Sequence, residues 1–443
     1  MKLEDKARKF AIEAHKGQVR KSDLEKPMII HPIDVAQILK QYELDENVVA
    51  AGYLHDVVED TKYEIEDIEK EFGSDISSLV YGASEPDKSL SWEERKQHTI
   101  DKTKKLDFRH KAVICADKIS NLEDLRFLSE IKGEYDFSAF KRGFASQKWY
   151  YTEVYNSLIF NEDEKHHMFI RLKELIDYIF YDNNDEYVKN IIFKNNEEEY
   201  KRLNKIHYRK EEVYKLKKVL SNSQSYVIEF TGTPRTGKTS LISNLKDFFK
   251  KKGFSIEILE EFTTSEKYKK EIYPTLKDKY KNVVNSEIPK YVLKQLEDSI
   301  SKNPDIIIID RSLFDRLIWV DRLFLKDGMS KEEYKLYKET YIPLIKEKID
   351  IVISAYTDSL TSLKRDYNTN LSLEKRSFLN ETNVNEYNNS LLNMKKLANK
   401  EKINFKLFDT TSKNQREISF EVIDFILKDM RKKLLDKVNK EFN

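Results

Sequence analysis

Histidine and aspartate residues in three short N-terminal motifs are of the types that hold divalent metal ions. Imidazole and carboxylate groups together can bind such an ion, which lowers the pKa of a bound water and offsets negative charge on a departing phosphate oxygen. The pattern predicts a metal-dependent phosphohydrolase, with hydrogen-bonded core residues as the alternative. The residues are His31 in IIHP (29–32), the adjacent pair His55 and Asp56 in LHDVVEDT (54–61), and Asp117 in ADKISN (116–121).

Two further carboxylates and a basic patch lie close to these motifs in the sequence. Glu59 follows His55 by four residues, which on a continuous helix places both on one face. Glu59 or Asp60 is then suited to orient or deprotonate the attacking water, with simple surface exposure as the alternative. A compact basic patch is formed by Arg20, Lys21 and Ser22. It is suited to bind a phosphate or a base, with a solvated run of charges as the alternative.

A glycine-containing loop predicts a nucleotide site in the second half of the chain. The apolar run YVIEF (226–230) leads into GTPRTGKT (232–239), and a helical pattern follows. In this strand–loop–helix setting, backbone N–H groups surround phosphate oxygens, the lysine reaches the outer phosphates, and the threonine hydroxyl after it ligates Mg²⁺. We therefore expect ATP or GTP with Mg²⁺ to bind at Gly232, Thr233, Pro234, Arg235, Thr236, Gly237, Lys238, Thr239 and Ser240.

A later apolar run carries the expected partner of this loop. DIIIID (305–310) ends in Asp310, which is placed to hold the Mg²⁺, and Arg311 follows within reach of a phosphate. Two glutamates that close the second strand-like run are candidates to bind an acceptor or act as a base, unless they only cap the strand. The basic segment 359–377 is either a flexible lid or a solvated helical face. The acceptor or lid candidates are Glu260, Glu261, Lys364, Arg365 and Arg376.

The periodicity of apolar residues changes along the chain and predicts the fold class. Residues 1–182 show helical periods with almost no strand-like runs, including one buried helix expected at 48–60. From residue 226 onward, short β-rich runs alternate with longer helical segments, which predicts a parallel sheet covered on both faces. We expect an all-α hydrolase domain, a helical connector and a three-layer α/β domain of the P-loop kinase type, at 1–182, 183–222 and 223–443.

Composition restricts the classes of function. The 443 residues carry 79 Lys and Arg against 78 Asp and Glu, a balance that argues against a generic nucleic-acid binder. No apolar run approaches the roughly 18 residues of a membrane span, and the first residues form a charged amphipathic pattern rather than a signal peptide. The single cysteine, Cys115, fits a reducing compartment. These features predict a cytoplasmic protein whose partners are small-molecule nucleotides, without nucleic acid or membrane, and they leave a homo-oligomer open.

The ordered N-terminal motifs resemble the hydrolase domain of the RelA/SpoT family and its small stand-alone homologues. The resemblance implies an HD-type enzyme that removes the 3′-pyrophosphate from guanosine tetra- and pentaphosphate, the alarmones of the stringent response. Some stand-alone relatives act on NADPH, so that substrate remains an alternative. The resemblance covers roughly residues 1–180 through AHKGQVRKS (14–22), IIHP, YLHDVVEDT (53–61), EFG (71–73), WEERK (92–96), ADKISN and KWYY (148–151).

The same resemblance implies a role for each matching residue. Glu59 and Asp60 would activate the water. Met28 departs from the family, which usually has Tyr there, and this bears on the shape of the base pocket rather than on the metal. The implied Mn²⁺ ligands are His31, His55, Asp56 and Asp117, and the implied nucleotide contacts are Arg20, Lys21, Ser22 and Asn121.

The DRS and DR motifs at 310–316 resemble the nucleoside and nucleotide kinase group of P-loop proteins, over about residues 224–432. Together the two resemblances imply a bifunctional enzyme, in which a pyrophosphohydrolase is fused to a kinase for a small molecule or nucleotide. Two alternatives remain. The P-loop module is a non-catalytic NTP sensor that regulates the hydrolase, or the whole chain is a stress or phage-defence effector that depletes NADPH or another nucleotide.

Overall fold

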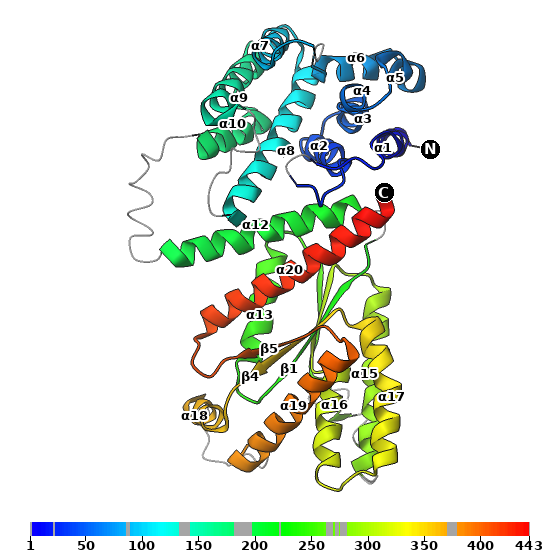
Figure 1. Ribbon diagram of the computed structural model, residues 1–443, viewed down its shortest axis with the longest axis vertical. Coiled ribbons are helices and arrows are strands. Elements are labelled where there is room, and N and C mark those ends of the chain that lie inside the picture. The colour runs from blue at the N-terminus through cyan, green and yellow to red at the C-terminus, as the bar shows by residue number, and fades with distance from the viewer. Residues whose placement is uncertain are drawn as a thin grey trace. The chain divides into compact units, whose positions relative to one another are not determined.

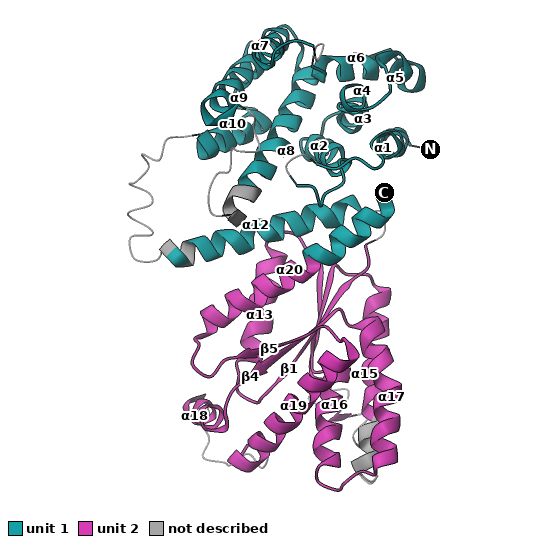
Figure 2. Ribbon diagram, viewed as in Figure 1, with its two compact units in different colours: residues 1–221, 431–443 teal, residues 222–430 magenta. Residues whose placement is uncertain are grey.

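The chain divides into two compact units, which Figure 2 distinguishes by colour. Unit 1 comprises residues 1–221 and 431–443, and unit 2 comprises residues 222–430. The computed structural model describes residues 2–20, 23–85, 89–132, 142–180, 197–220, 223–262, 269–270, 274, 281–369 and 379–442.

Unit 1 is built from helices, as Figure 1 shows. Within its described residues the only β pairing is an isolated antiparallel bridge between Val19 and Pro27. The predicted all-α fold is therefore confirmed. The helices are α1 (Leu3–Ala14), α2 (Ile30–Gln41), α3 (Glu46–Leu54), α4 (Val57–Asp60), α5 (Ile65–Phe72), α6 (Ser74–Ala83), α7 (Trp92–Thr103), α8 (Phe108–Lys132), α9 (Gly143–Ile159), α10 (His167–Phe180) and α12 (Glu197–Val219).

Close packing of α2, α3 and α8 forms the centre of unit 1. Helix α3 begins at the N-cap Asp45, whose carboxylate accepts from two backbone N–H groups, and it is buried from Val48 to Leu54. At Gly52 a Cβ atom would lie 2.6 Å from Leu39 Cδ1 and 3.1 Å from the Ala36 Cα on α2. Glycine thus permits the close approach of α2 and α3, and this approach sets the spacing of the residues at their ends.

The prediction of one continuous buried helix at 48–60 is wrong, because the structure has two helices there. Helix α3 ends at Leu54 and α4 begins at Val57, with His55 and Asp56 in a turn between them. The interruption supplies the backbone turn that two adjacent ligands need to approach one point. Contrary to the prediction from the sequence, Glu59 therefore does not share a continuous helix face with His55.

Unit 2 contains a five-stranded sheet in the order β2-β3-β1-β4-β5, with every paired neighbour parallel. The expected strand–helix alternation is confirmed. The strands are β1 (Tyr226–Gly232), β2 (Ile256–Leu259), β3 (Ile306–Asp310), β4 (Ile351–Tyr356) and β5 (Phe405–Asp409), and the helices are α13 (Lys238–Lys250), α15 (Lys281–Ser301), α16 (Leu313–Phe324), α17 (Lys331–Lys348), α18 (Ser359–Thr369), α19 (Glu381–Glu401) and α20 (Gln415–Phe442).

Both faces of the three central strands, β3, β1 and β4, are buried, as the apolar strands predict. Val227, Ile307 and Val352 pack in a core with residues of α15, α16, α17 and α19. Their strand neighbours Ile228 and Ile308 point to the opposite face and are also fully buried. A sheet covered on both faces is the three-layer arrangement expected from the sequence.

The boundaries of the two units differ from those expected for three segments. Helix α12 (Glu197–Val219), within the expected connector, belongs to unit 1 and packs on α8 and α2. Helix α20 begins in unit 2, but its residues from Arg431 onward belong to unit 1. The start of the expected connector, 183–196, lies outside the described residues. Among the described helices, none combines the length and apolarity needed to cross a membrane.

Candidate metal centre and nucleotide-binding loop

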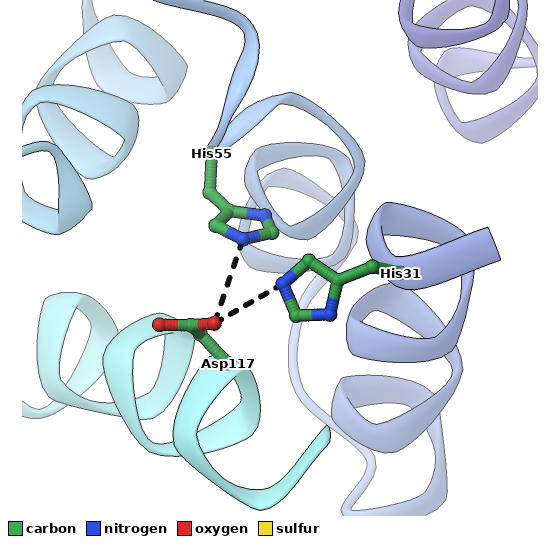
Figure 3. A group of neighbouring side chains, drawn as sticks. All are labelled: His31, His55 and Asp117. Atoms are coloured by element: carbon green, nitrogen blue, oxygen red, sulfur yellow. Dashed lines mark hydrogen bonds and ion pairs between the residues drawn. The ribbon is translucent and has the colours of Figure 1, made fainter. Parts of the chain in front are cut away.

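Three of the predicted metal ligands converge inside unit 1, as Figure 3 shows. His31 comes from α2, His55 from the turn after α3, and Asp117 from α8. One ligand atom from each lies within 4.8 Å of the other two, and both imidazoles are only 3% exposed. The Asp117 Oδ1 atom is 3.1 Å from His31 Nε2 and 3.9 Å from His55 Nε2. This spacing suits coordination of one small cation.

Asp56, the fourth predicted ligand, lies against both imidazoles. Its Oδ1 atom is 3.2 Å from His55 Nε2, and its Oδ2 atom is 3.5 Å from His31 Nε2. The turn between α3 and α4 therefore directs adjacent side chains toward the same point. All four predicted ligands meet in one small region, although they are spread over 86 residues of sequence.

Hydrogen bonds behind the two imidazoles orient their ring nitrogens. His55 Nδ1 is 2.9 Å from the Gly52 carbonyl, which only accepts, so Nδ1 carries the proton in the neutral ring. His31 Nδ1 is 3.0 Å from Ser120 Oγ, which donates to Asp34. In both rings Nε2 is thereby left with its lone pair toward the carboxylates. The Nε2 atom of His55 makes no hydrogen bond within the described part of the chain, as expected for a metal ligand.

The charges in this region favour an added positive charge. Burial opposes ionisation of His55, but the neighbouring carboxylates of Asp56 and Asp117 raise its pKa to about 9. The pKa of Asp56 is lowered despite burial, chiefly by His55. Burial and the charge of Arg20 together lower the pKa of His31. We call these four residues, His31, His55, Asp56 and Asp117, the cage. Because the cage stabilises a proton on a buried imidazole, it also attracts a metal cation, and its residues therefore fit a metal ion.

Glu59 has the environment of a general base beside this cage. Burial and the negative charge of Asp56 raise its pKa to about 7, and its carboxylate accepts from the Glu85 backbone N–H. A base with a pKa near neutral is effective in proton abstraction. Asp60 is half-buried, and its backbone carbonyl accepts from Gln18 Nε2 at 2.7 Å.

Of the predicted nucleotide contacts, Asn121 contacts a predicted metal ligand, and Arg20 contacts Asn121. Arg20 Nη2 donates to Asn121 Oδ1 at 3.1 Å and to Asp124 Oδ2 at 2.9 Å. Asn121 Nδ2 in turn donates to Asp117 Oδ1 at 2.5 Å. Arg20 and Asn121 are therefore positioned at the edge of the cage. The predicted contacts Lys21 and Ser22 lie outside the described residues.

A cationic cluster next to Asp117 was not singled out from the sequence. Lys118 Nζ lies 2.6 Å from Asp117 Oδ2 and 5.5 Å from the ring centre of Tyr150. Lys96 lies 4.5 Å from the same ring and pairs with Glu85. Two lysines beside a metal cage are suited to the negative charge of a phosphorylated ligand. Both belong to motifs quoted for the family resemblance, so position within those motifs was the available signal.

The glycine-containing loop of unit 2 joins β1 to α13, as the sequence predicts. Gly232 ends β1 at φ +138°, and a Cβ there would lie 2.0 Å from the Ala355 carbonyl of β4. Gly237 takes a left-handed conformation at the N-cap of α13. Lys238 contacts Asp310 at the end of β3, while the hydroxyl-bearing Thr239 is exposed. The loop and the carboxylate thus meet at the carboxyl edge of the sheet, where ligands bind in such folds.

Arg311 is held in a left-handed backbone conformation, at φ +63°, directly after β3. Its Nη2 atom is 3.4 Å from the Gly232 carbonyl, and its Nε atom is 3.4 Å from Glu261 Oε2. Non-glycine residues in this conformation are strained and cluster at functional sites. The fully buried Asp315, which the sequence reasoning passed over, lies 3.4 Å from Arg311 Nη1. Of the two glutamate candidates, Glu261 is thus near the site and Glu260 is exposed.

The predicted lid begins as a regular helix. Arg365 on α18 donates to Thr410 Oγ1 at 3.1 Å and to the Thr410 carbonyl at 2.6 Å, so it lies against the segment that follows β5. Lys364 is exposed on the same helix. The third lid candidate, Arg376, lies outside the described residues.

This architecture defines a class of protein in which a helical domain with a candidate metal site precedes a P-loop α/β domain. Residues 7–135 match the family described as HD domain, and residues 227–346 match the family described as AAA domain. Neither match covers half of the chain, so each describes one part of it.

The N-terminal region is similar to curated enzymes from animals. It is 43% identical over 119 residues to the guanosine-3′,5′-bis(diphosphate) 3′-pyrophosphohydrolase MESH1 of Drosophila melanogaster, covering 26% of this chain and 66% of that protein. It is 40% identical over 122 residues to the MESH1 of Xenopus tropicalis, covering 27% of this chain and 68% of that protein. The chain belongs, through this region, to the MESH1 family of HD-domain proteins.

The shared region is limited in length. The chain spans just under two thirds of the fly enzyme and less than a fifth of the long bacterial relatives that it also matches. The chain is also similar to a solved structure of deoxyadenosine kinase from M. mycoides with bound dATP. The similarity covers 46% of this chain and 99% of the kinase chain, at 22% identity and a TM-score of 0.33.

Proposed function

We propose that unit 1 is a Mn²⁺-dependent pyrophosphohydrolase that removes the 3′-pyrophosphate from guanosine tetra- or pentaphosphate. The observation that carries this proposal is the convergence of His31, His55 and Asp117 with both Nε2 atoms facing the carboxylates. The substrate is supported by the name of the MESH1 relatives, which are guanosine-3′,5′-bis(diphosphate) 3′-pyrophosphohydrolases.

The residues present would hold the ion through nitrogen and oxygen atoms alone. His31, His55, Asp56 and Asp117 would be its ligands, and the two carboxylates of this set suit a hard divalent cation such as Mn²⁺. When bound, the ion would polarise the phosphate and lower the pKa of an attacking water. Ser120 and the Gly52 carbonyl orient the imidazoles that hold it.

The other side chains supply binding and proton transfer. Glu59 accepts a proton from the water that attacks phosphorus, while the bond from phosphorus to the ribose 3′-oxygen breaks and that oxygen gains a proton. Arg20 and Asn121 bind the nucleotide at the edge of the cage. Lys96 and Lys118 offset the negative charge of the pyrophosphoryl group as it is transferred to water.

The direct test incubates the purified protein with Mn²⁺ and guanosine tetraphosphate and measures pyrophosphate and GDP. We expect one pyrophosphate per GDP, and a loss of at least about a hundredfold in rate for Asp56→Ala. A parallel incubation with NADPH tests the alternative substrate. Equal release by wild type and Asp56→Ala would contradict the assignment of the site, and activity on NADPH alone would contradict the proposed substrate.

For unit 2 we propose binding of ATP or GTP with Mg²⁺ and transfer of a phosphoryl group to a small molecule. Support comes from the loop geometry, from Asp310 beside Lys238, and from the strained Arg311 near Glu261. The glutamate would accept the acceptor proton, and the arginine would stabilise the transferring phosphoryl group.

Labelled ATP and a panel of nucleosides and nucleotides distinguish this proposal from a sensor. A labelled acceptor product supports the kinase. A hydrolase rate in unit 1 that changes with ATP or GTP, without any labelled product, contradicts phosphoryl transfer and favours a regulatory role. Glu261→Gln serves as the matched variant, because it should retain nucleotide binding and lose the product.

A further inference from the structure

Arg20 lies in a short hairpin, by which we mean residues 18–20 and 23–28, and backbone hydrogen bonds join its two arms. The Arg20 N–H donates to the Lys26 carbonyl at 2.9 Å, and the Met28 N–H donates to the Gln18 carbonyl at 2.8 Å. Val19 and Pro27 form the β bridge between these two bonds. The position of Arg20 at the metal cage therefore depends on where residues 23–28 are fixed.

Arg431, in the part of α20 that belongs to unit 1, is bound to this hairpin by two carboxylates. Its Nη2 atom is 3.0 Å from Asp23 Oδ2, and its Nη1 atom is 2.9 Å from Glu25 Oε2. Its Nε atom lies 2.8 Å from Glu212 Oε2 on α12. The three arms of one guanidinium thus join two residues of the hairpin to a helix behind it.

A buried ion pair completes this set of contacts. We call the set the clamp, and its residues are Asp23, Glu25, Lys26, Glu212 and Arg431. Lys26 Nζ lies 2.8 Å from Glu212 Oε1, and the two side chains are 7% and 3% exposed. Asp23 is also largely buried, at 13% exposure. Without Arg431, Asp23 would be left with Lys26 at 3.8 Å. Glu212 would be left with Lys26 and the nearby charge of Arg209. Because buried charges without partners are costly, the hairpin would move to bring Asp23 into water.

We propose that Arg431 is a positioning residue for substrate binding, acting through the hairpin on Arg20. This inference rests on the proposed function of unit 1, with the polyphosphate-bearing nucleotide as its ligand. The HD-domain match ends at residue 135, so Glu212 and Arg431 lie outside it. Two parts of the clamp therefore come from segments of unit 1 that this match does not cover. Since Arg431 touches neither the metal ligands nor Glu59, its loss affects binding of the nucleotide more than the chemical step.

The kinetic test uses a double-mutant cycle in the full-length protein. Arg431→Ala should raise KM for guanosine tetraphosphate about tenfold and change kcat less than about twofold, and in an Arg20→Ala background it should raise KM less than about twofold. Lys432→Ala removes the same charge from an exposed neighbour and should leave both constants unchanged. The same factor in both backgrounds, or a fall in kcat at unchanged KM, would overturn the inference.

Hydrogen exchange tests the clamp without relying on hydrolysis. In Arg431→Ala, amide exchange in a peptide covering 18–28 should become faster, while α3 keeps its protection. Arg431→Lys retains a charge but not the three-armed geometry and should give an intermediate rate, which provides a second variant should the first fail to fold. Unchanged exchange in the hairpin would overturn the clamp. Faster exchange in a protein that releases no pyrophosphate would support the clamp and contradict the proposed function.

Discussion

The two candidate sites are built in opposite ways. In unit 1 the site is a set of buried side chains from α2, the α3–α4 turn and α8, brought together only by helix packing. In unit 2 most of the site is one continuous loop, whose backbone is shaped by Gly232 and Gly237 and whose Thr239 is exposed. Loss of one ligand side chain should therefore abolish the function of the metal site in unit 1. Loss of one side chain from the loop in unit 2 should only weaken its affinity for the nucleotide.

The largest expected effect tests the cage. Asp117→Ala removes the carboxylate that approaches both imidazoles, and pyrophosphate release should fall about a thousandfold, equivalent to about 4 kcal/mol of transition-state stabilisation. Chelation of the metal with EDTA should reduce the wild-type rate to a similar level, and added Mn²⁺ should restore it. ATP binding to unit 2 of Asp117→Ala, measured by calorimetry with Mg²⁺ and without EDTA, is the control and should equal that of the wild type. A loss of less than tenfold would show that the cage tolerates a missing ligand.

Glu59→Gln separates the chemical step from metal binding. The variant retains size and hydrogen bonding but cannot accept a proton, so kcat should fall about a hundredfold while Mn²⁺ affinity stays within a few-fold of wild type. Stopped assays for kcat and a Mn²⁺ titration provide the two measurements. An unchanged kcat would show that another group acts as the general base. Asp60→Asn is the matched comparison.

Lys238→Ala tests the more tolerant site. Loss of a charge-assisted contact to phosphate should weaken ATP binding by about 2 kcal/mol, which is about thirtyfold in Kd. Pyrophosphate release by unit 1 should be unaffected when ATP is absent. Should that rate fall as far as in Asp117→Ala, the two sites would not be separable, and the contrast between them would be lost.

The smallest expected effect lies on the surface of unit 1. Arg109 pairs with Asp45 at 3.0 Å and with Asp75 at 2.8 Å, and its hydrogen bonds lower the pKa of Asp75 to about 2. All three side chains are at least one third exposed, so Arg109→Ala should cost only about 0.5 kcal/mol of unfolding free energy at pH 7.

The pH dependence of this pair follows from the direction of the shift. Folded Asp75 holds its proton less tightly than the unfolded chain does, so the stabilisation is present above pH 3.8 and is lost as pH falls through about 2. Urea denaturation of wild type and Arg109→Ala should therefore converge toward pH 2, and also in 1 M salt. A difference that grows with acid would contradict the ion-pair explanation.

Local sequence was sufficient for the fold class of both regions and for the residue types of their sites, but not for every element. The run FKLFD (405–409) forms β5 (Phe405–Asp409), one of the short β-rich runs expected from residue 226 onward. It is an edge strand of the sheet, and of its five residues only Phe408 is buried. Helix α7 (Trp92–Thr103) was missed because it has few apolar residues. Its capping box, Ser91 with Glu94, was the available signal.

The assembly of the metal centre was beyond the reach of local patterns. The motifs identified His31, His55 and Asp117 as ligand types, since chemistry depends on side-chain identity and short spacing. Their convergence depends on the packing of α2 and α3 across Gly52 and on the break before α4. The attachment of Arg431 to the hairpin that carries Arg20 likewise arises only in the folded chain, because residues some 400 positions apart meet through tertiary contacts that no local pattern encodes.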